Sequence, residues 1–385
     1  MLRGPRMLYP LHELSRLSFD AMSSLISTLR HAPVPLVRAQ AALLHRITKP
    51  YPKPGFNIPG ATEEVVVERP FCRLVRFAAP QHERRVLVVA PLSGHHATLV
   101  RDTVATLLTD HEVYVTDWID AREVPVERGT FSLDDYVTEL RGFIRHLGAP
   151  LHVVAVCQPT VPTLAAVSLM AAAGETTPRS LVLMGGPVDA RRNPTVVDKL
   201  ATDHPIEWFE RQMIHRVPAR YPGAGRLVYP GFLQLAAFVM MNPDKHARAY
   251  WQYWLDRLRG DDAAAQQHER FYDEYNAVLD MDARYYLDTV RTVFQEFALA
   301  RGTWRVGAEL VEPATITATP VFTIEGELDD ISGLGQTAAA LELCRNAPGK
   351  RNLVATGCGH YGLFSGSRWR ESIYPEVREF IRSHA

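Results

Sequence analysis

Cysteine is scarce in this sequence, and its spacing excludes two kinds of structure. The 385 residues include four cysteines, which are Cys72, Cys157, Cys344 and Cys358. Four scattered cysteines do not make a disulfide framework, and none of them has the paired C-x-x-C spacing of a zinc site. The sequence therefore predicts a protein of the reducing cytoplasm with no bound metal.

The sequence also lacks an excess of charge and a long apolar run. Its 42 basic and 43 acidic residues leave a net charge of −1, so no nucleic-acid partner is predicted. The longest apolar stretch, Leu227 to Pro243, is interrupted by Pro230 and Gln234. It is shorter than the roughly 20 residues that cross a bilayer. The first residues carry charges where a secretion signal needs an apolar core, so neither a transmembrane segment nor secretion by that route is expected.

No internal repeat is visible, and the sequence instead alternates between strand-like and helix-like segments. Apolar runs such as VLVVA and VVAV, each followed by a helical pattern, are typical of strands buried on both faces of a parallel sheet. The alternation lapses between about residues 193 and 300, where aromatic, helix-compatible sequence dominates. The predicted fold class is α/β, with a mostly parallel sheet, helices on both faces and an inserted α-helical cap. The turn in residues 151–160 specifies it as an α/β-hydrolase fold.

This pattern divides the chain into four predicted segments. They are an N-terminal helical arm with a Pro-rich connector (1–60), the first part of the α/β-hydrolase core (61–192), the helical cap or lid (193–310) and the second part of the core (311–385). In the arm, apolar residues recur at helical spacing at Leu11, Leu14, Met22, Leu25 and Leu29. We expect this apolar side to pack on the main body, with a surface-binding anchor as the alternative.

The run LHVVAVCQPT, residues 151–160, ends a strand-like segment on Cys157 and places a proline where a strand could not continue. A nucleophile elbow is a tight turn between a strand and a helix, and Ala155 and Pro159 stand two residues either side of Cys157. Proline is tolerated in the first turn of a helix, whose N-terminus stabilises a thiolate over a thiol. A buried structural cysteine is the alternative, and the turn alone does not decide between the two.

Two later turns supply a candidate acid and base. Asp329 and Asp330 follow the strand-like PVFTIEGEL, and His360 lies in the turn GCGHYG. In α/β-hydrolases the acid and the histidine follow the nucleophile in this order, which favours catalysis over packing. His360 would be the general base and a carboxylate would orient its ring. We choose Asp329, because the acid commonly lies two residues before an apolar residue, here Ile331. Asp189 is a second candidate acid.

Backbone amides are the candidate donors to an oxyanion. The amide of Gln158 follows the nucleophile, and the loop PLSGHH offers the amide of Leu92 or Ser93. His95 and His96 in this loop have no third ligand at a metal-like spacing, so the edge of a turn is the predicted role.

The segment GLGQTA, Gly333 to Ala338, matches a G-x-G-x-x-A dinucleotide fingerprint. It lacks the acidic residue about 20 positions further on and lies late in the predicted sheet. We therefore interpret it as a loop that leads into a helix, and no cofactor is predicted.

Several longer segments resemble the intracellular polyhydroxyalkanoate depolymerases, which hydrolyse stored poly(3-hydroxybutyrate) with a catalytic cysteine. They include APLSGHHATLVRDTV, AVCQPTVPTLAAVSLMA, GGPVDARRNPT, EGELDDISGLGQT and GCGHYGLFSGSRWR. The resemblance implies Cys157 as nucleophile, Asp329 as acid and His360 as base. It also implies a polyhydroxyalkanoate polymer or granule surface as partner, and 3-hydroxyacid monomers or short oligomers as products.

Two other functions are compatible with these features. Polyhydroxyalkanoate synthases share the fold and the triad but build the polyester from a coenzyme A thioester. A non-catalytic granule-coating protein could keep the fold and use the arm and cap for adhesion. The sequence does not determine the oligomeric state, and a homo-oligomer is compatible with it.

Overall fold

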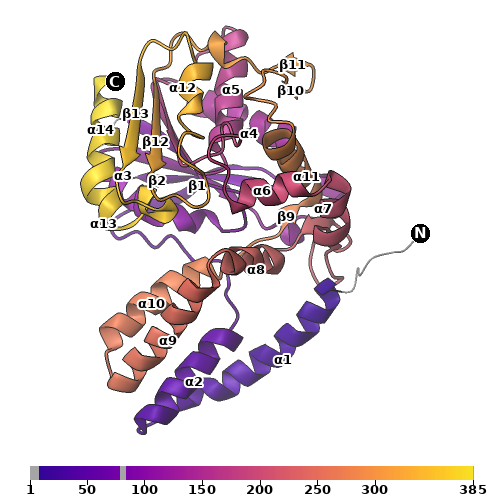
Figure 1. The fold of residues 1–385 in the computed structure, drawn as a ribbon, viewed down its shortest axis with the longest axis vertical. Coiled ribbons are helices and arrows are strands. Elements are labelled where there is room, and N and C mark those ends of the chain that lie inside the picture. Colours follow the sequence, from indigo (N-terminus) through magenta and orange to yellow (C-terminus); the bar gives the residue numbers. More distant parts are fainter. Residues whose placement is uncertain (1–7, 79–83, 385) are drawn as a thin grey trace.

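The protein is described by a computed structural model that covers residues 8–78 and 84–384. Figure 1 shows a sheet with helices on both sides and, below it, a group of helices from the N-terminal part and the middle of the chain. The strands of the main sheet are β1 (Thr62–Glu68), β2 (Cys72–Ala78), β3 (Arg85–Val89), β4 (Glu112–Trp118), β5 (Leu151–Val156), β6 (Ser180–Met184), β12 (Val321–Gly326) and β13 (Lys350–Ala355).

The strand order is β1-β2-β4-β3-β5-β6-β12-β13. The hairpin of β1 and β2 is antiparallel, and β2 is antiparallel to β4, whereas the strands from β4 to β13 are mutually parallel. A mostly parallel sheet with crossover helices confirms the predicted α/β-hydrolase fold class.

The sheet is buried on both faces because its strands are apolar throughout. In β5, Val153 and Ala155 face one core, and Val154 and Val156 face the other. Helices cover both faces: α3 (Arg101–Leu107), α4 (Leu133–Leu147), α5 (Thr160–Ala172), α12 (Ala339–Leu343), α13 (Gly366–Arg368) and α14 (Tyr374–Ser383). The carboxyl ends of the parallel strands therefore share one edge, where the loops after β5, β12 and β13 meet.

The segment between β6 and β12 is mainly helical, as predicted, and it also contains short strands that the sequence did not indicate. Its helices are α6 (Val196–Asp203), α7 (Ile206–Met213), α8 (Gly231–Met241), α9 (Pro243–Arg259), α10 (Asp262–Tyr275), α11 (Ala283–Thr289) and the π-helix η4 (Val290–Gln295). Its strands are β7 (His215–Arg216), β8 (Leu227–Tyr229), β9 (Met281–Asp282), β10 (Arg305–Val306) and β11 (Glu309–Leu310). Within residues 8–78 and 84–384, none of the helices has the length and apolarity needed to span a bilayer.

The arm consists of α1 (Leu8–Leu29) and α2 (Pro35–Thr48), which form a hairpin beside α9 and α10 (Figure 1). We call α1, α2, α9 and α10 together the helical lobe. A connector without helix or strand, residues 49–61, leads from α2 to β1.

The expectation that the apolar side of α1 packs on the main body is wrong for three of its residues. Leu14, Met22 and Leu29 are 62%, 41% and 49% exposed, and the side chains of Leu11 and Leu25 lie outside the described part. Instead, α1 is anchored by a polar contact, because the Tyr9 hydroxyl donates a hydrogen bond of 2.5 Å to Asp280. Helical spacing identifies an apolar face but does not say what covers it.

A buried arginine joins the inserted segment to the core. The guanidinium of Arg226 donates to the carbonyls of Val124, Pro125 and Gly129, and to the carboxylate of Asp282 at 2.9 Å. Arg226 and Asp282 are both almost fully buried. Their charges are tolerated there because the pair and the three carbonyls satisfy the donors of the guanidinium.

Arg226→Met should therefore lower the free energy of unfolding by about 3–5 kcal/mol, because it leaves Asp282 and the carbonyls buried without their partner. Urea denaturation followed by circular dichroism measures this change. Arg216→Met is the matched control, since the Arg216 side chain is exposed and donates to the Gly225 carbonyl. Its cost should stay within about 0.5 kcal/mol, and equal losses in both variants would contradict the prediction.

Candidate active site

Cys157 stands at the turn between β5 and α5 in a left-handed backbone conformation, with φ 68°. Its amide donates to the Met184 carbonyl at 2.7 Å, and its own carbonyl accepts from the Thr160 amide at 3.1 Å. Left-handed backbone at a residue other than glycine is strained and is often found at functional sites. Cys157 is partly exposed, whereas the other three cysteines are buried.

The turn is possible because the neighbouring strand ends in glycine. A Cβ atom on Gly186 would lie 1.8 Å from Thr160 Oγ1 and 2.4 Å from the Cys157 carbonyl oxygen. No side chain fits there, so the sharp turn and the loop after β6 depend on each other. The pair of glycines that follows SLVLM in the sequence was a signal for this close approach.

His360 and Asp329 come from the loops after β13 and β12. The Nδ1 atom of His360 is 2.8 Å from Asp329 Oδ2. The other oxygen, Asp329 Oδ1, accepts hydrogen bonds of 2.9 Å from the amides of Ile331 and Ser332. The Asp329 side chain is fully buried, so its carboxylate is fixed by the backbone and in turn fixes the imidazole ring.

The electrostatic environment favours a protonated His360 ring. Burial lowers the pKa of His360, but the charges of Cys157 and Asp329, and the hydrogen bonds to them, outweigh burial and raise this pKa well above its usual value. These interactions thus stabilise the protonated form of the ring.

The two other candidate acids from the sequence, Asp330 and Asp189, have different partners from Asp329. The Asp330 carboxylate accepts a hydrogen bond of 2.9 Å from the Asn242 side chain at the surface. Asp189 is held by Arg191, whose Nε lies 2.7 Å away, and by Arg192. These contacts account for both alternatives as surface or loop residues.

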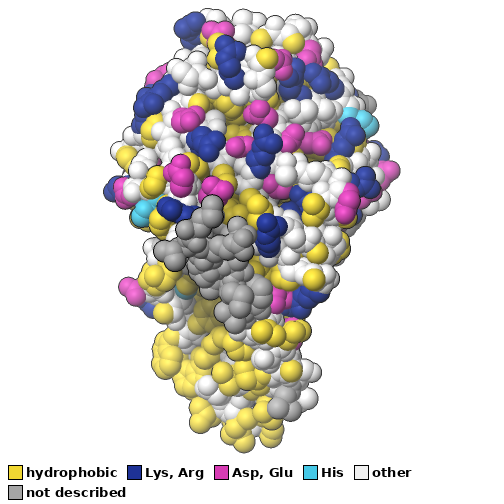
Figure 2. Space-filling model, turned by 90° about the vertical axis from the view of Figure 1, so that its right-hand side faces the viewer, with side chains coloured by type: hydrophobic (Ala, Val, Ile, Leu, Met, Phe, Trp, Pro, Cys, Tyr) yellow, Lys and Arg dark blue, Asp and Glu magenta, His cyan; other side chains and the backbone are white. Residues whose placement is uncertain are grey.

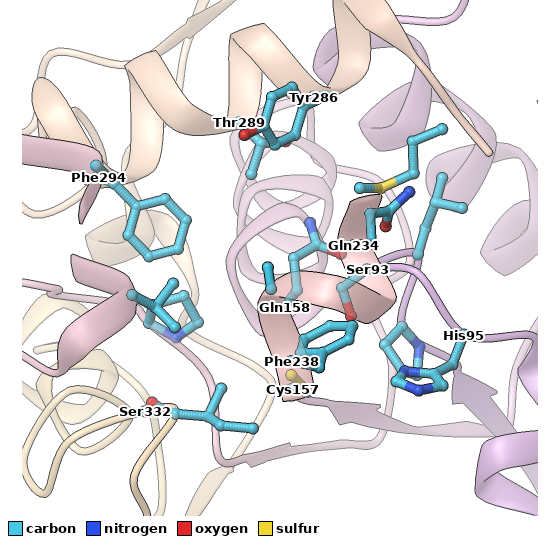
Figure 3. Close-up of a pocket in the computed structure, with 18 of the residues that line it drawn as sticks. Ser93, His95, Cys157, Gln158, Gln234, Phe238, Tyr286, Thr289, Phe294 and Ser332 are labelled. Atoms are coloured by element: carbon cyan, nitrogen blue, oxygen red, sulfur yellow. The ribbon is translucent and has the colours of Figure 1, made fainter. Parts of the chain in front are cut away.

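The predicted nucleophile, base and oxyanion donors line one cavity of about 400 Å³. Cys157 and His360 are in its wall together with Leu92, Ser93 and Gln158. Figure 3 shows the Cys157 sulfur and the Ser93 and Gln158 side chains at one end, and Tyr286 and Phe294 across the cavity from them. Asp329 does not line the cavity but contacts His360 directly.

The inserted segment supplies the opposite wall, which is mainly apolar. Its contributions come from the helices α6, α7, α8, α11 and η4, and include Val196, Leu200, Phe209, Phe238, Met240, Met241, Tyr286, Val290 and Phe294. The cavity is thus mainly apolar, with a thiol and an imidazole at one end. This composition is typical of sites for apolar ligands.

A few buried polar groups in this cavity make no well-formed hydrogen bond to the described residues. Both side-chain polar atoms of Gln158 and the hydroxyl of Tyr285 are in this state, although the two side chains lie near each other. Gln158 is only 9% exposed, and it also follows the thiol in sequence. The sequence analysis considered only its backbone amide, since no pattern reveals where a single glutamine side chain points.

The two histidines of the PLSGHH loop, His95 and His96, are buried within the fold. His95 Nε2 lies 3.1 Å from the Tyr275 carbonyl, and burial lowers the pKa of His95 to about 4. Burial likewise lowers the pKa of His96 to about 3. Among residues 8–78 and 84–384, no group of three or more histidine, cysteine or acidic side chains is placed to hold a metal ion.

The GLGQTA segment is a loop before α12, as predicted, and it already holds an anion. The amides of Gly335, Thr337 and Ala338 donate to one carboxylate oxygen of Glu325, at 2.9, 2.9 and 3.0 Å. Successive amides of this kind form an anion-binding nest. Here the nest is filled by a residue of β12, which explains its likeness to a phosphate-binding fingerprint.

Comparison with known proteins identifies the family of the chain. Residues 185–385, just over half of the chain, match the family model described as PHB de-polymerase C-terminus. No curated protein matches the sequence. BpoC from Mycobacterium tuberculosis H37Rv is similar in fold, with 16% identity, a TM-score of 0.50, and 82% of this chain and 96% of that chain covered. A monoacylglycerol lipase from Paleococcus ferrophilus shows 15% identity and a TM-score of 0.49, over 82% of this chain and 99% of that chain.

Asp329→Asn should lower the pKa of His360, because it removes a negative charge that stabilises the protonated ring. The ring should then lose its proton at a lower pH than in the unaltered protein. An NMR titration of the imidazole resonances measures this difference. Asp330→Asn is the control, because Asp330 binds Asn242 and not the ring. The same displacement in both variants, or none in Asp329→Asn, would contradict the assignment of the partner.

Proposed function

The chain belongs to the PHB depolymerase family and is an ester-hydrolysing enzyme, and on this premise we propose that Cys157, His360 and Asp329 cleave poly(3-hydroxybutyrate) through an acyl-cysteine intermediate. The observation that carries the proposal is the placement of Cys157 on a strained turn in the same cavity as His360, whose ring is bonded to buried Asp329. A nucleophile, a base and an orienting acid are the groups that acyl transfer requires.

In the first half of the reaction, the Cys157 sulfur attacks the carbonyl carbon of an ester unit. The carbonyl oxygen becomes an oxyanion, to which the backbone amides of Gln158 and of Leu92 or Ser93 would donate hydrogen bonds. The carbon–oxygen ester bond then breaks, and His360 gives its proton to the departing alkoxide. One part of the polymer leaves as an alcohol, and the other remains as a thioester on Cys157.

In the second half, water attacks the thioester carbonyl carbon while His360 accepts a proton from that water. The carbon–sulfur bond breaks, which releases a carboxylic acid and regenerates the thiolate beside a protonated ring. Asp329 remains ionised throughout and keeps the ring in the tautomer that allows both transfers.

The substrate that we propose is amorphous polyester stored in cytoplasmic granules, and the products are 3-hydroxyacid monomers or short oligomers. The apolar wall of the cavity supports this choice, because the polyester carries no charge and exposes methyl groups along its length. The family resemblance of the motifs around Cys157 and His360 points to the same substrate.

Cys157→Ala should reduce the release of 3-hydroxybutyrate from amorphous poly(3-hydroxybutyrate) by at least about 10³-fold, since the nucleophile is lost. Cys344→Ala is the matched control, because Cys344 is buried away from the cavity. If Cys157→Ala keeps its activity, the proposed mechanism is wrong. Release of coenzyme A from 3-hydroxybutyryl-coenzyme A with growth of polymer would instead identify a synthase.

The side chain of Gln158 suits a polar contact with the polyester. Its buried amide makes no well-formed hydrogen bond to the described residues, although it lies near the Tyr285 hydroxyl, and a repeating ester offers an acceptor oxygen beyond the carbonyl under attack. We propose that the amide donates to an oxygen of the bound acyl unit. Such a bond would recover part of the free energy that an unpaired buried amide costs.

Gln158→Leu should therefore lower kcat/KM for a soluble 3-hydroxybutyrate trimer by roughly tenfold, the value of one hydrogen bond. Hydrolysis of 4-nitrophenyl butyrate should be little affected. Its acyl unit lacks the oxygen on carbon 3 that the Gln158 amide would bind, and the backbone amide of Gln158 remains. Steady-state kinetics on both substrates test this. Equal losses on the two substrates would show that Gln158 only supports the shape of the site.

A further inference from the structure

The second helix of the arm presents an apolar stripe to solvent. Leu36, Leu44 and Ile47 lie on one side of α2 and are 57%, 39% and 60% exposed. The opposite side is buried against the rest of the lobe, where Arg46 forms an ion pair with Asp273 of α10. The outward direction of the stripe is therefore set by the packing of the lobe.

The first helix adds a second exposed apolar side next to this stripe. Leu14, Met22 and Leu29 are the exposed residues of α1 described above, and α1 packs directly on α2. Figure 2 shows hydrophobic side chains gathered over the lower part of the molecule, whereas charged side chains are spread over the core above it. We call these residues of α1 and α2 the lobe surface. Exposed apolar patches of this kind mark interaction sites.

The arm carries few charges for an anionic membrane. Residues 8–48 contain Arg16, Arg30, Arg38 and Arg46 against Glu13 and Asp20. Arg16 pairs with Glu13 and Asp20, at 3.5 and 3.6 Å, and Arg46 is buried in its ion pair, which leaves two arginines of the arm without an ion pair among the described residues. Helices that lie on anionic membranes instead carry an excess of Lys and Arg on their polar face. An uncharged apolar solid matches this surface better than a phospholipid headgroup layer does.

The lobe is also connected to the candidate active site through α8. Figure 1 shows α8 between the core and the lobe. Met240 of α8 is 73% exposed and also lines the cavity, and α9 of the lobe begins two residues after α8 ends. Trp251 of α9 is a further exposed apolar side chain, at 60%. Exposed apolar side chains thus occur at the cavity, on α9 and on the arm.

We propose that the lobe surface docks the enzyme on the apolar surface of the solid polyester, next to the cavity that receives a chain from it. This proposal rests on the proposed function, because the polyester is the substrate of the site. Docking would raise the local concentration of ester bonds at the cavity without altering the chemistry at Cys157. Removing it should affect insoluble polymer and spare soluble substrates.

The test compares Leu36→Glu/Ile47→Glu with the matched double variant Val65→Glu/Val126→Glu. Val65 and Val126 are 49% and 48% exposed, lie on the core, and receive the same substitution. Adsorption is measured by co-sedimentation with amorphous poly(3-hydroxybutyrate) particles in a Cys157→Ala background, so that no polymer is consumed. Hydrolysis of the soluble trimer is measured with Cys157 present.

The lobe variant should bind to the particles at least about tenfold more weakly than the unaltered protein, because two apolar side chains no longer become buried on the polymer. Its hydrolysis of particles should fall in parallel, with trimer hydrolysis within about twofold of the unaltered enzyme. The core variant should adsorb normally.

Unchanged adsorption of the lobe variant overturns the proposal, as does equal adsorption of the unaltered protein to phosphatidylglycerol vesicles. A dimer in light scattering that the lobe substitutions dissociate would also overturn it, by assigning the surface to a second copy. Failure of the proposed function is distinct, since it would appear as absent trimer hydrolysis.

Discussion

The left-handed backbone at Cys157 is the constraint on which the arrangement of the site depends. A residue other than glycine in this conformation costs on the order of 1–3 kcal/mol, so the surroundings must hold it. The Cys157 amide is bonded to the end of β6, and Gly186 leaves the space that the turn occupies. The Thr337 hydroxyl in turn accepts from the Gly186 amide and donates to its carbonyl. The direction of the thiol is therefore set by the register of neighbouring strands, and not by the turn alone.

Charge near the site is neutralised by nearby groups, which leaves the cavity free for an apolar ligand. Glu325 is held by the amides before α12, and Asp189 by two arginines. Asp329 is held by the amides of Ile331 and Ser332, and it directs its remaining oxygen to His360. The thiol and imidazole of Cys157 and His360 are then the reactive groups presented to a ligand, in a compartment whose other walls are mostly apolar.

Much of this arrangement was predictable, because it follows from turns that are local in sequence. The positions of Cys157, Asp329 and His360 at strand ends came from short motifs in a fixed order, and the structure brings the three together, although their catalytic roles remain predictions. The exposed face of α1 was not predictable, since a helical pattern does not identify the partner that covers it. The direction of the Gln158 side chain and the two-residue strands of the inserted segment depend on contacts between distant segments. Such contacts leave no local signal in a single sequence.

The anchoring of the arm has a consequence for the order in which the chain folds during synthesis. Tyr9 binds Asp280 and Arg46 binds Asp273, across sequence separations of 271 and 227 residues. At a synthesis rate of about 5–20 residues per second, these partners follow the arm out of the ribosome by roughly 10–50 seconds. During that interval α1 and α2 have neither their anchors nor α9 to pack on. A newly made chain therefore leaves the apolar sides of α1 and α2 uncovered until the middle of the chain has been synthesised.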